Sequence, residues 1–291
     1  MFAIAYLVVR VAHLSMYVVA AGDDAPLRRQ VLITSSAMVT GSVLLIVGAL
    51  IGGAAQTWLW LAGLTLDVVL TYATSRRGNW RVQSAAHWTE RYGLIVILAL
   101  GESIVAIGVG VAQEAISVPI LVGALLAVAL SVLLWWLYFD VIAIAAEHRM
   151  ASLHGAERAG LAIDAYTYLH FAIIAGVIIS ALGVEEAMRY VAEAEAFGYF
   201  GAWGLFGGTS LYLAGHGAFW RRTGGAWKVW RMLGAAVLLA LIPLAAMLPA
   251  LAALGLVVLV VAGVVVTETL LHADARAEVR SGLHSVGENG S

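Results

Sequence analysis

The stretch His87–Ile107, HWTERYGLIVILALGESIVAI, decides the fold class of this chain. It begins with polar residues beside a group of arginines and continues as an apolar run. A helix that crosses a bilayer needs about 20 mostly apolar residues, and this stretch is close to that length. The carboxylate of Glu102 nevertheless lies deep inside the run. Because a charge at mid-membrane costs about 2.5–3.5 kcal/mol on insertion scales, Glu102 is a candidate functional residue.

The composition of the whole chain indicates that lipid is its main solvent. Of its 291 residues, 62% are hydrophobic and 12% are charged, whereas soluble domains carry about 25% charged residues. A net charge of −2 argues against nucleic acid as a partner. The chain has no cysteine, which excludes disulfides, thiolate metal sites and thiol nucleophiles. We expect a protein whose partner is the lipid bilayer and which needs no cofactor.

Nine apolar segments are long enough to cross a membrane. They are separated by polar or glycine-rich joints, and Pro249 divides the last two. Their continuous Leu- and Ala-rich runs favour helices over the alternating strands of an outer-membrane barrel. The predicted fold is therefore all-α, a polytopic transmembrane helical bundle. The predicted spans are 2–21, 31–51, 57–75, 90–112, 117–146, 161–184, 197–220, 229–248 and 250–271.

The basic residues predict the orientation of these spans, because cytoplasmic loops carry an excess of Lys and Arg. Alternation of nine spans places most of them on one side and only Arg189 on the other, with Arg10 inside a span. We therefore expect the N-terminus outside and the C-terminus in the cytoplasm. The residues on the predicted cytoplasmic side are Arg28, Arg29, Arg76, Arg77, Arg81, Arg91, Arg149, Arg158, Arg221, Arg222, Lys228, Arg231, Arg276 and Arg280.

A weak internal repeat relates the two ends of the chain. A His, a basic residue and an acid occur twice with similar spacing, as His13, Arg29 and Asp67 and as His216, Arg231 and Glu268. This predicts two parallel-repeat six-helix units with the first unit truncated; chance agreement between similar helices is the alternative. The predicted organisation is three transmembrane helices in 1–75, a basic cytoplasmic loop in 76–89, six transmembrane helices in 90–272 and a cytoplasmic polar tail in 273–291.

Several motifs resemble a known family. They are Glu90-Arg91-Tyr92-Gly93-Leu94, Leu100-Gly101-Glu102-Ser103, Trp135-Trp136-Leu137-Tyr138-Phe139-Asp140 and Tyr168-Leu169-His170. In these motifs the chain resembles the bacterial low-temperature-requirement protein A (LtrA) family. The resemblance implies a multi-pass protein of the bacterial inner (cell) membrane, but little chemistry, because the family name records a growth phenotype. Family members usually begin with further helices, so a shortened chain or a mis-assigned start codon is expected.

Polar residues inside the predicted spans are the candidate residues of a substrate or ion pathway. Arg10 and His13 share one helix face with Tyr6 and Tyr17, and this face should point into the bundle. Arg10 needs an anionic ligand or a carboxylate partner, for which Glu102 and Asp67 are the candidates. For Glu102 itself, a proton or cation site stands against a structural role, in which it caps a neighbouring helix or pairs with Arg10.

A second group of ionisable residues falls in the predicted cytoplasmic halves of the spans. Their similar depth predicts an inward-facing polar cavity in which histidines titrate near neutral pH. A solvated helix end for Asp140 and hydrogen-bonded core positions for the histidines are the structural alternatives. His87 and Glu90 have i, i+3 spacing, but they lie at the interface beside Arg91, so we expect no metal site. The group comprises Asp67, Asp140, His170, His216 and Glu268.

Polar residues at membrane depth, with almost no extramembrane domain, favour a secondary transporter or permease for a small solute, with protons as a possible partner. Any catalytic or signalling site would also have to lie in the membrane. A membrane-embedded enzyme acting on a lipid or lipid-linked substrate, and a non-catalytic membrane protein supporting cold or envelope stress, are the alternatives. An enzyme is the less favoured class, and a homo-oligomer is left open. Separately, Gly48 with Gly52 and Gly204 with Gly208 have the GxxxG spacing that predicts close helix packing.

Overall fold

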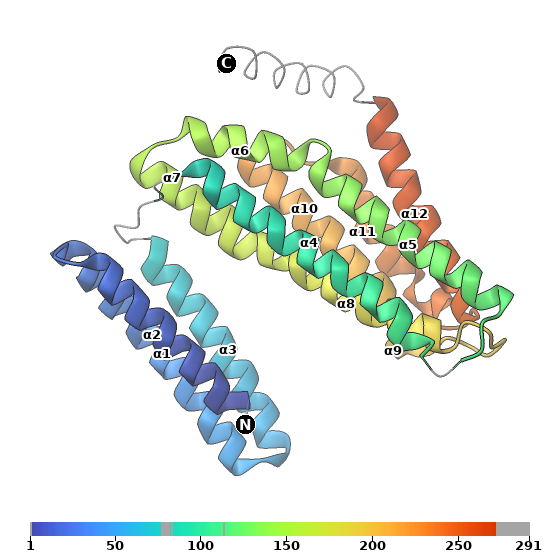
Figure 1. The fold of residues 1–291 in the computed structure, drawn as a ribbon, viewed down its shortest axis with the longest axis horizontal. Helices are drawn as coiled ribbons and strands as arrows, with labels where there is room; N and C mark the ends of the chain where they lie inside the picture. The colour runs from blue at the N-terminus through green and yellow to red at the C-terminus, as the bar shows by residue number, and fades with distance from the viewer. Residues whose placement is uncertain (1, 77–81, 83, 113, 272–291) are drawn as a thin grey trace. The chain divides into compact units, whose positions relative to one another are not determined.

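The computed structural model describes residues 2–76, 82, 84–112 and 114–271, and every named element in this part of the chain is a helix (Figure 1). The prediction of an all-α polytopic bundle is confirmed. The predicted tail 273–291, and residues 77–81 and 83 of the predicted loop 76–89, lie outside the described residues. The chain forms two compact units: Met1–Val82 with His154–Ile163, called unit 1, and Gln83–Leu153 with Asp164–Ser291, called unit 2.

Seven helical stretches in the described residues are long and apolar enough to cross a membrane, two fewer than the nine predicted spans. The other two predicted segments are also helical. Helices α9 (Gly198–Ala202), η2 (Trp203–Gly207) and α10 (Gly208–Thr223) follow one another without a break. They form a helical stretch rich in glycine, which has low hydropathy, and α10 also carries His216. Helix α11 (Val229–Ala245) is apolar but short, because the chain turns before Pro249 and α12 (Ala250–Leu271) follows.

Unit 1 is built around a helical hairpin. Helices α2 (Ala25–Ile51) and α3 (Gly53–Arg76) pack along each other, and α1 (Phe2–Ala21) packs on α2. Asp24 caps α2, since its carboxylate accepts from the Leu27 backbone N–H at 3.1 Å. Gly52 ends α2 with a φ of 74°, a value that favours glycine. The unit also contains the short α7 (Gly155–Leu161).

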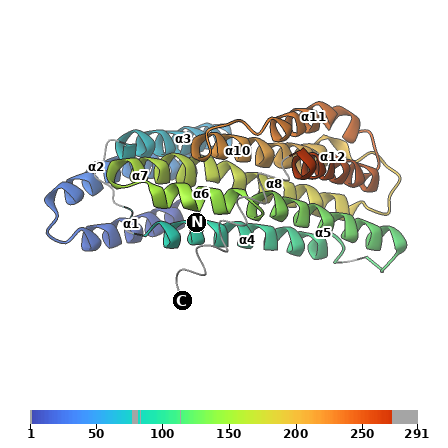
Figure 2. The ribbon, with the colours of Figure 1, turned by 90° about the horizontal axis from the view of Figure 1, so that it is seen from above.

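Unit 2 is a ring of long helices. Around the ring, α4 (Ala85–Gly110) contacts α8 (His170–Arg189), α8 contacts α10, α10 contacts α11, α11 contacts α12, α12 contacts α5 (Val118–Phe139), and α5 returns to α4. Helix α8 also contacts α5 and α12. Both ribbon views show the long helices of this unit running beside one another (Figure 2). A short α6 (Ile142–Ser152) follows α5, and a π-helix, η1 (Ala162–Leu169), precedes α8.

Glycines bring α8 against the continuous helix η2–α10. A Cβ atom on Gly183 would overlap the backbone nitrogen of Leu205, and one on Gly208 would overlap that of Ser180. A Cβ on Gly204 would lie 3.0 Å from the Cα of Gly183. The packing role predicted for Gly204 and Gly208 is therefore confirmed. We call this contact the glycine seam.

The second GxxxG pair behaves differently. A Cβ on Gly48 would lie 2.8 Å from a ring carbon of Trp60, so Gly48 allows α2 and α3 to approach. Gly52 has no atom within 4 Å of its Cβ position and ends the helix instead. The packing role predicted for Gly52 is wrong, because a glycine at a helix C-terminus supplies the positive φ of the turn.

The surface of unit 2 is apolar over its long helices. Leu98 on α4, Leu125 on α5 and Leu259 on α12 are each at least 70% exposed. Water would not solvate such a surface well, whereas lipid chains would. With the apolar length of the helices, this surface identifies a multi-pass membrane protein.

Candidate functional site

Arg231, in the first turn of α11, is the centre of a buried polar cluster in unit 2, and its side chain is 4% exposed. Its Nε donates to Glu268 Oε1 at 3.0 Å and its NH2 group donates to Glu268 Oε2 at 2.9 Å. The two residues therefore form a bidentate ion pair. Its NH1 group donates to the Leu137 carbonyl oxygen at 3.1 Å and to His216 Nδ1 at 2.8 Å. One guanidinium therefore joins α11 to α12, α5 and α10.

The end of α5 makes a backbone acceptor available to Arg231. Helix α5 ends at Phe139, and the chain turns through the half-buried Asp140 before α6 begins. The last carbonyl groups of a helix have no partner within it, so the Leu137 oxygen is open to an outside donor. The predicted span 117–146 lies almost wholly within one stretch long and apolar enough to cross a membrane, Val118–Ser152, and a turn divides this stretch into α5 and α6.

The contact with Arg231 sets the tautomer of His216. A guanidinium can only donate, so Nδ1 of the neutral imidazole must accept and Nε2 must carry the proton. The His216 side chain is fully buried, and its Nε2 has no hydrogen-bond partner among the described residues. The Tyr212 ring lies 4.6 Å from the His216 ring and the Tyr138 ring 5.5 Å away, between centroids. The Nε2–H donor of His216 therefore lies among aromatic rings.

A second histidine extends the cluster to α8. The Tyr138 hydroxyl lies 3.0 Å from His170 Nε2, and both side chains are buried. The rings of Tyr92 and Tyr166 pack around His170, at 5.0 Å and 6.5 Å between centroids. The Tyr166 hydroxyl is buried and has no hydrogen-bond partner among the described residues. Tyr166 belongs to the π-helix η1, a type of irregularity that is frequent at functional sites.

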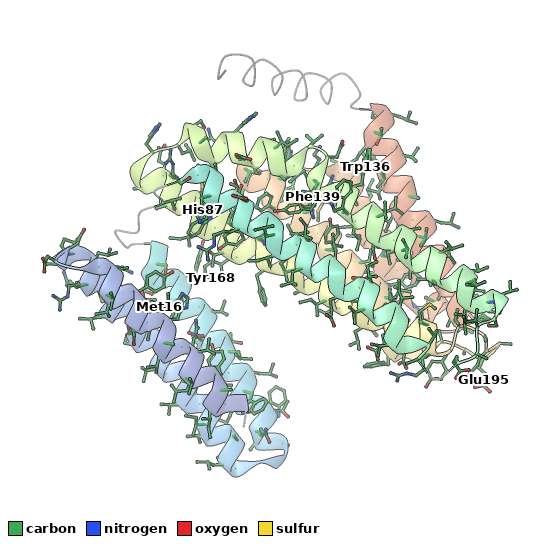
Figure 3. All side chains as sticks on the ribbon, in the orientation of Figure 1. Met16, His87, Trp136, Phe139, Tyr168 and Glu195 are labelled. Carbon is green, nitrogen blue, oxygen red and sulfur yellow. The ribbon has the colours of Figure 1, made fainter. Side chains whose placement is uncertain are left out.

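We call this cluster the polar layer. Tyr212 joins it through its hydroxyl, which donates to the Leu134 carbonyl oxygen at 2.5 Å. Figure 3 labels Trp136 and Phe139 on α5 and Tyr168 on η1, which are neighbours in sequence of its members. The members of the polar layer are Tyr138, Tyr166, His170, Tyr212, His216, Arg231 and Glu268.

The sequence identified His170, His216 and Glu268 as candidates but missed the residue that holds the last two together. Arg231 stands among the basic residues of a loop, so it was interpreted as a topology signal and as a member of the internal repeat, but not as a site residue. Its position inside the apolar run 229–248, with the spacing to His216 and Glu268, was the available signal. Tyr138 was missed because a tyrosine beside Phe139 fits an ordinary apolar helix.

Another ion pair in unit 2 was also missed. Asp164 in η1 accepts from Arg222 Nε at 3.0 Å, and the Arg222 side chain is 38% exposed. The two residues are 58 positions apart, and no local pattern links them. The pair joins η1 to the end of α10.

In unit 1, Asp67 is the carboxylate partner of Arg10. Arg10 is ion-paired and hydrogen-bonded to Asp67, and the Tyr6 hydroxyl donates to the same carboxylate at 2.6 Å. His13 and Tyr17 are exposed within this unit, with ring centroids 4.9 Å apart. The first half of the predicted stripe on α1, Tyr6 and Arg10, therefore bonds to Asp67 on α3.

Several candidates on α4 lie away from the polar layer. Glu102 is exposed on the surface of unit 2, as are Glu90, Arg91 and Gly101, whereas Ser103 is buried. The buried stripe of α4 runs through its small residues, which include Gly93 and Ser103. The structure therefore does not bring Glu102 together with Asp140, His170 or His216. No group of three or more His, Asp or Glu side chains within the described ranges could hold a metal ion.

The apolar helices and the charges buried between them define a polytopic membrane protein with an ionisable interior. The chain belongs to the family described as bacterial low temperature requirement A protein (LtrA), whose model matches residues 1–266. The resemblance found in the sequence is confirmed. Comparisons with curated proteins and with solved structures found no match.

Proposed function

We propose that this protein is a secondary transporter or permease, and that the polar layer of unit 2 handles a small solute or protons. The observation that carries the proposal is the presence of two buried groups, His216 Nε2 and the Tyr166 hydroxyl, without a partner among the described residues. Buried polar groups nearly always have a hydrogen-bond partner. A small polar solute or water passing through the layer would supply one.

The chemistry of the two groups limits what they can bind. Arg231 holds His216 in the tautomer that presents an N–H donor at Nε2. A hydroxyl such as that of Tyr166 both donates and accepts. The charges of Arg231 and Glu268 cancel within the layer, so the layer suits a solute that carries a hydrogen-bond acceptor and little net charge. Ionisable groups inside membrane helices are frequent on substrate and proton pathways, which supports the same conclusion.

We also propose that the protein lies in the bacterial cell membrane with its basic loops in the cytoplasm and its N-terminus outside. The excess of Lys and Arg on one side supports this orientation. Within unit 2, His87 and Glu195 lie at opposite ends, as the alternation of spans requires (Figure 3). The polar layer then falls in the cytoplasmic half of the unit.

The test uses the full chain reconstituted in proteoliposomes with an internal pH dye. Wild-type protein should take up one member of a panel of small solutes or dissipate an imposed pH gradient. The substitution His216→Phe removes the Nε2 donor but keeps an aromatic ring, and it should abolish this flux. The matched control is His148→Phe, because His148 is exposed on α6.

Two results would overturn the proposal. One is wild-type protein that moves neither protons nor any solute of the panel. The other is His216→Phe protein that transports like wild type. Thermal unfolding in detergent accompanies each assay, so that loss of flux is separated from loss of the fold. The variant Tyr166→Phe adds a readout on the second unpartnered group: flux should fall while the fold remains.

A further inference from the structure

Lys228 is the single lysine of the 291 residues, beside fifteen arginines. It occupies the N-cap position of α11, three residues before Arg231, in the loop that follows α10. Its ammonium lies over the Trp220 ring, 4.8 Å from the ring centroid. In the described part of the chain it is hydrogen-bonded to no side chain and ion-paired with no carboxylate. Arg231 and Arg222, in contrast, are paired with Glu268 and Asp164.

Lys228 also lines a pocket at this end of unit 2. The pocket encloses about 140 Å³, and its remaining walls are Trp227, Val229, Trp230 and Glu268. Trp227 and Trp230 are 54% and 40% exposed. Trp is enriched at the level of lipid headgroups, where one side of the ring is apolar and the other wet.

The charges around the pocket leave one positive charge uncompensated. Glu268 lines the pocket, but its carboxylate accepts hydrogen bonds from Nε and NH2 of Arg231. Lys228 and Arg231 thus share one carboxylate among the described residues, which leaves a net positive charge at the pocket. The first backbone N–H groups of α11, at Val229 and Trp230, also belong to the pocket-lining residues. Such groups lack partners inside a helix and add to the attraction for an anion.

We propose that this pocket binds a phosphate group, presented either by an anionic lipid headgroup or by a free phosphate. Phosphate offers several oxygen acceptors to a compact ammonium and to backbone N–H groups at once. Its position beside the exposed Trp227 and Trp230 suits a group at the membrane surface. The proposal is independent of transport through the polar layer and would stand if transport failed.

Partial burial lowers the pKa of the Lys228 ammonium, and the nearby Arg231 charge acts in the same direction, against an opposing effect of Glu268. An anion stabilises the charged form and so raises this pKa. Binding should therefore weaken as pH rises through the pKa of Lys228. At a fixed pH, a bound phosphate should also reduce the fraction of neutral, reactive amine.

The single lysine permits a direct experiment. Purified full-length protein in dodecyl maltoside is treated with an amine-acetylating reagent, and the modification of Lys228 is followed by peptide mass spectrometry. One arm adds inorganic phosphate, against chloride at equal ionic strength. The other adds phosphatidylglycerol to the micelles, against a neutral galactolipid that lacks phosphate. Slower acetylation in the first arm identifies free phosphate as the ligand, and slower acetylation in the second arm alone identifies a lipid headgroup.

A second measurement uses variants and native mass spectrometry with the same probes. Lys228→Met should weaken phosphate or phosphatidylglycerol binding by roughly tenfold or more, because hydrogen bonds from charged donors are among the stronger ones. Arg221→Met is the matched control: Arg221 lies in the last turn of α10, is exposed, and donates to the Gly225 carbonyl oxygen. Acetylation of Lys228 that neither probe slows, or equal binding by folded Lys228→Met and wild type, would overturn the proposal.

Discussion

At the scale of single residues, two tyrosines of the polar layer differ in the hydrogen bonding of their hydroxyl groups. Tyr138 shares a hydrogen bond with His170, whereas the buried Tyr166 hydroxyl has no partner among the described residues. Removing one half of a buried hydrogen bond leaves the other half unsatisfied, at about 1–3 kcal/mol. Removing a hydroxyl that makes no bond carries no such cost.

We therefore predict opposite outcomes for the same chemical change at these two positions. Tyr138→Phe should lower the thermal stability of the detergent-solubilised protein by an amount equivalent to about 1–3 kcal/mol, because His170 loses its partner. Tyr166→Phe should be neutral or stabilising. Equal losses at both positions would show that a group outside the described residues satisfies Tyr166.

The sequence indicates buried polar residues most readily where their chemistry alone is unusual. A His or an acid inside an apolar span is visible without a structure, and His170, His216 and Glu268 all belong to the polar layer. The sequence could not rank them against Glu102, because α4 is apolar on more than one face. Which face is buried depends on the small residues, such as Gly93, that allow neighbouring helices to approach. The contact of Arg231 with the Leu137 carbonyl oxygen needed three-dimensional information, since the two residues are 94 positions apart.

At the scale of elements, the glycine seam makes α8 and η2–α10 depend on residues without side chains. We predict that Gly183→Val, whose side chain would meet the Leu205 backbone, destabilises the protein by at least the 1–3 kcal/mol typical of an overpacked core. The measurement is thermal unfolding in detergent. Backbone atoms cannot rotate away from a new methyl group, so the helices would have to separate.

Gly108→Val on α4 is the matched control for this prediction. No atom lies within 4 Å of a Cβ at Gly108, so the new side chain meets open space. Valine forms helices somewhat better than glycine, and the variant should be close to neutral or slightly stabilising. A Gly183→Val protein as stable as this control would contradict the close approach of the two helices.

At the scale of the whole molecule, most of the helical architecture could be predicted from the sequence, but not the breaks within it. Apolar length identified the segments that contain the long helices, because lipid requires every backbone group to be bonded internally. The turn after Phe139 and the two π-helices escaped prediction. At the turn after Phe139, the freed Leu137 carbonyl oxygen accepts from Arg231, a contact between helices that no local sequence pattern shows.

The proposed orientation can be tested with single cysteines, because the native chain has none. Ser152 and Glu193 are exposed at opposite predicted sides of the membrane. In intact cells, a membrane-impermeant maleimide should label Glu193→Cys protein and should reach Ser152→Cys protein only after the cells are permeabilised. The reverse pattern would show that the basic loops face outward.

The glycine seam also has a mechanical consequence. Packed side chains can exchange rotamers and let two helices slide, but contacts between backbones offer no such adjustment. Helix α8 and the helix η2–α10 should therefore move as one rigid body. In an alternating-access cycle, rocking would have to occur at interfaces lined by side chains, such as that of α5 with α12. Arg231 is hydrogen-bonded to α5, α12 and α10 at once, so these three helices would rotate about the Arg231 side chain in such a motion.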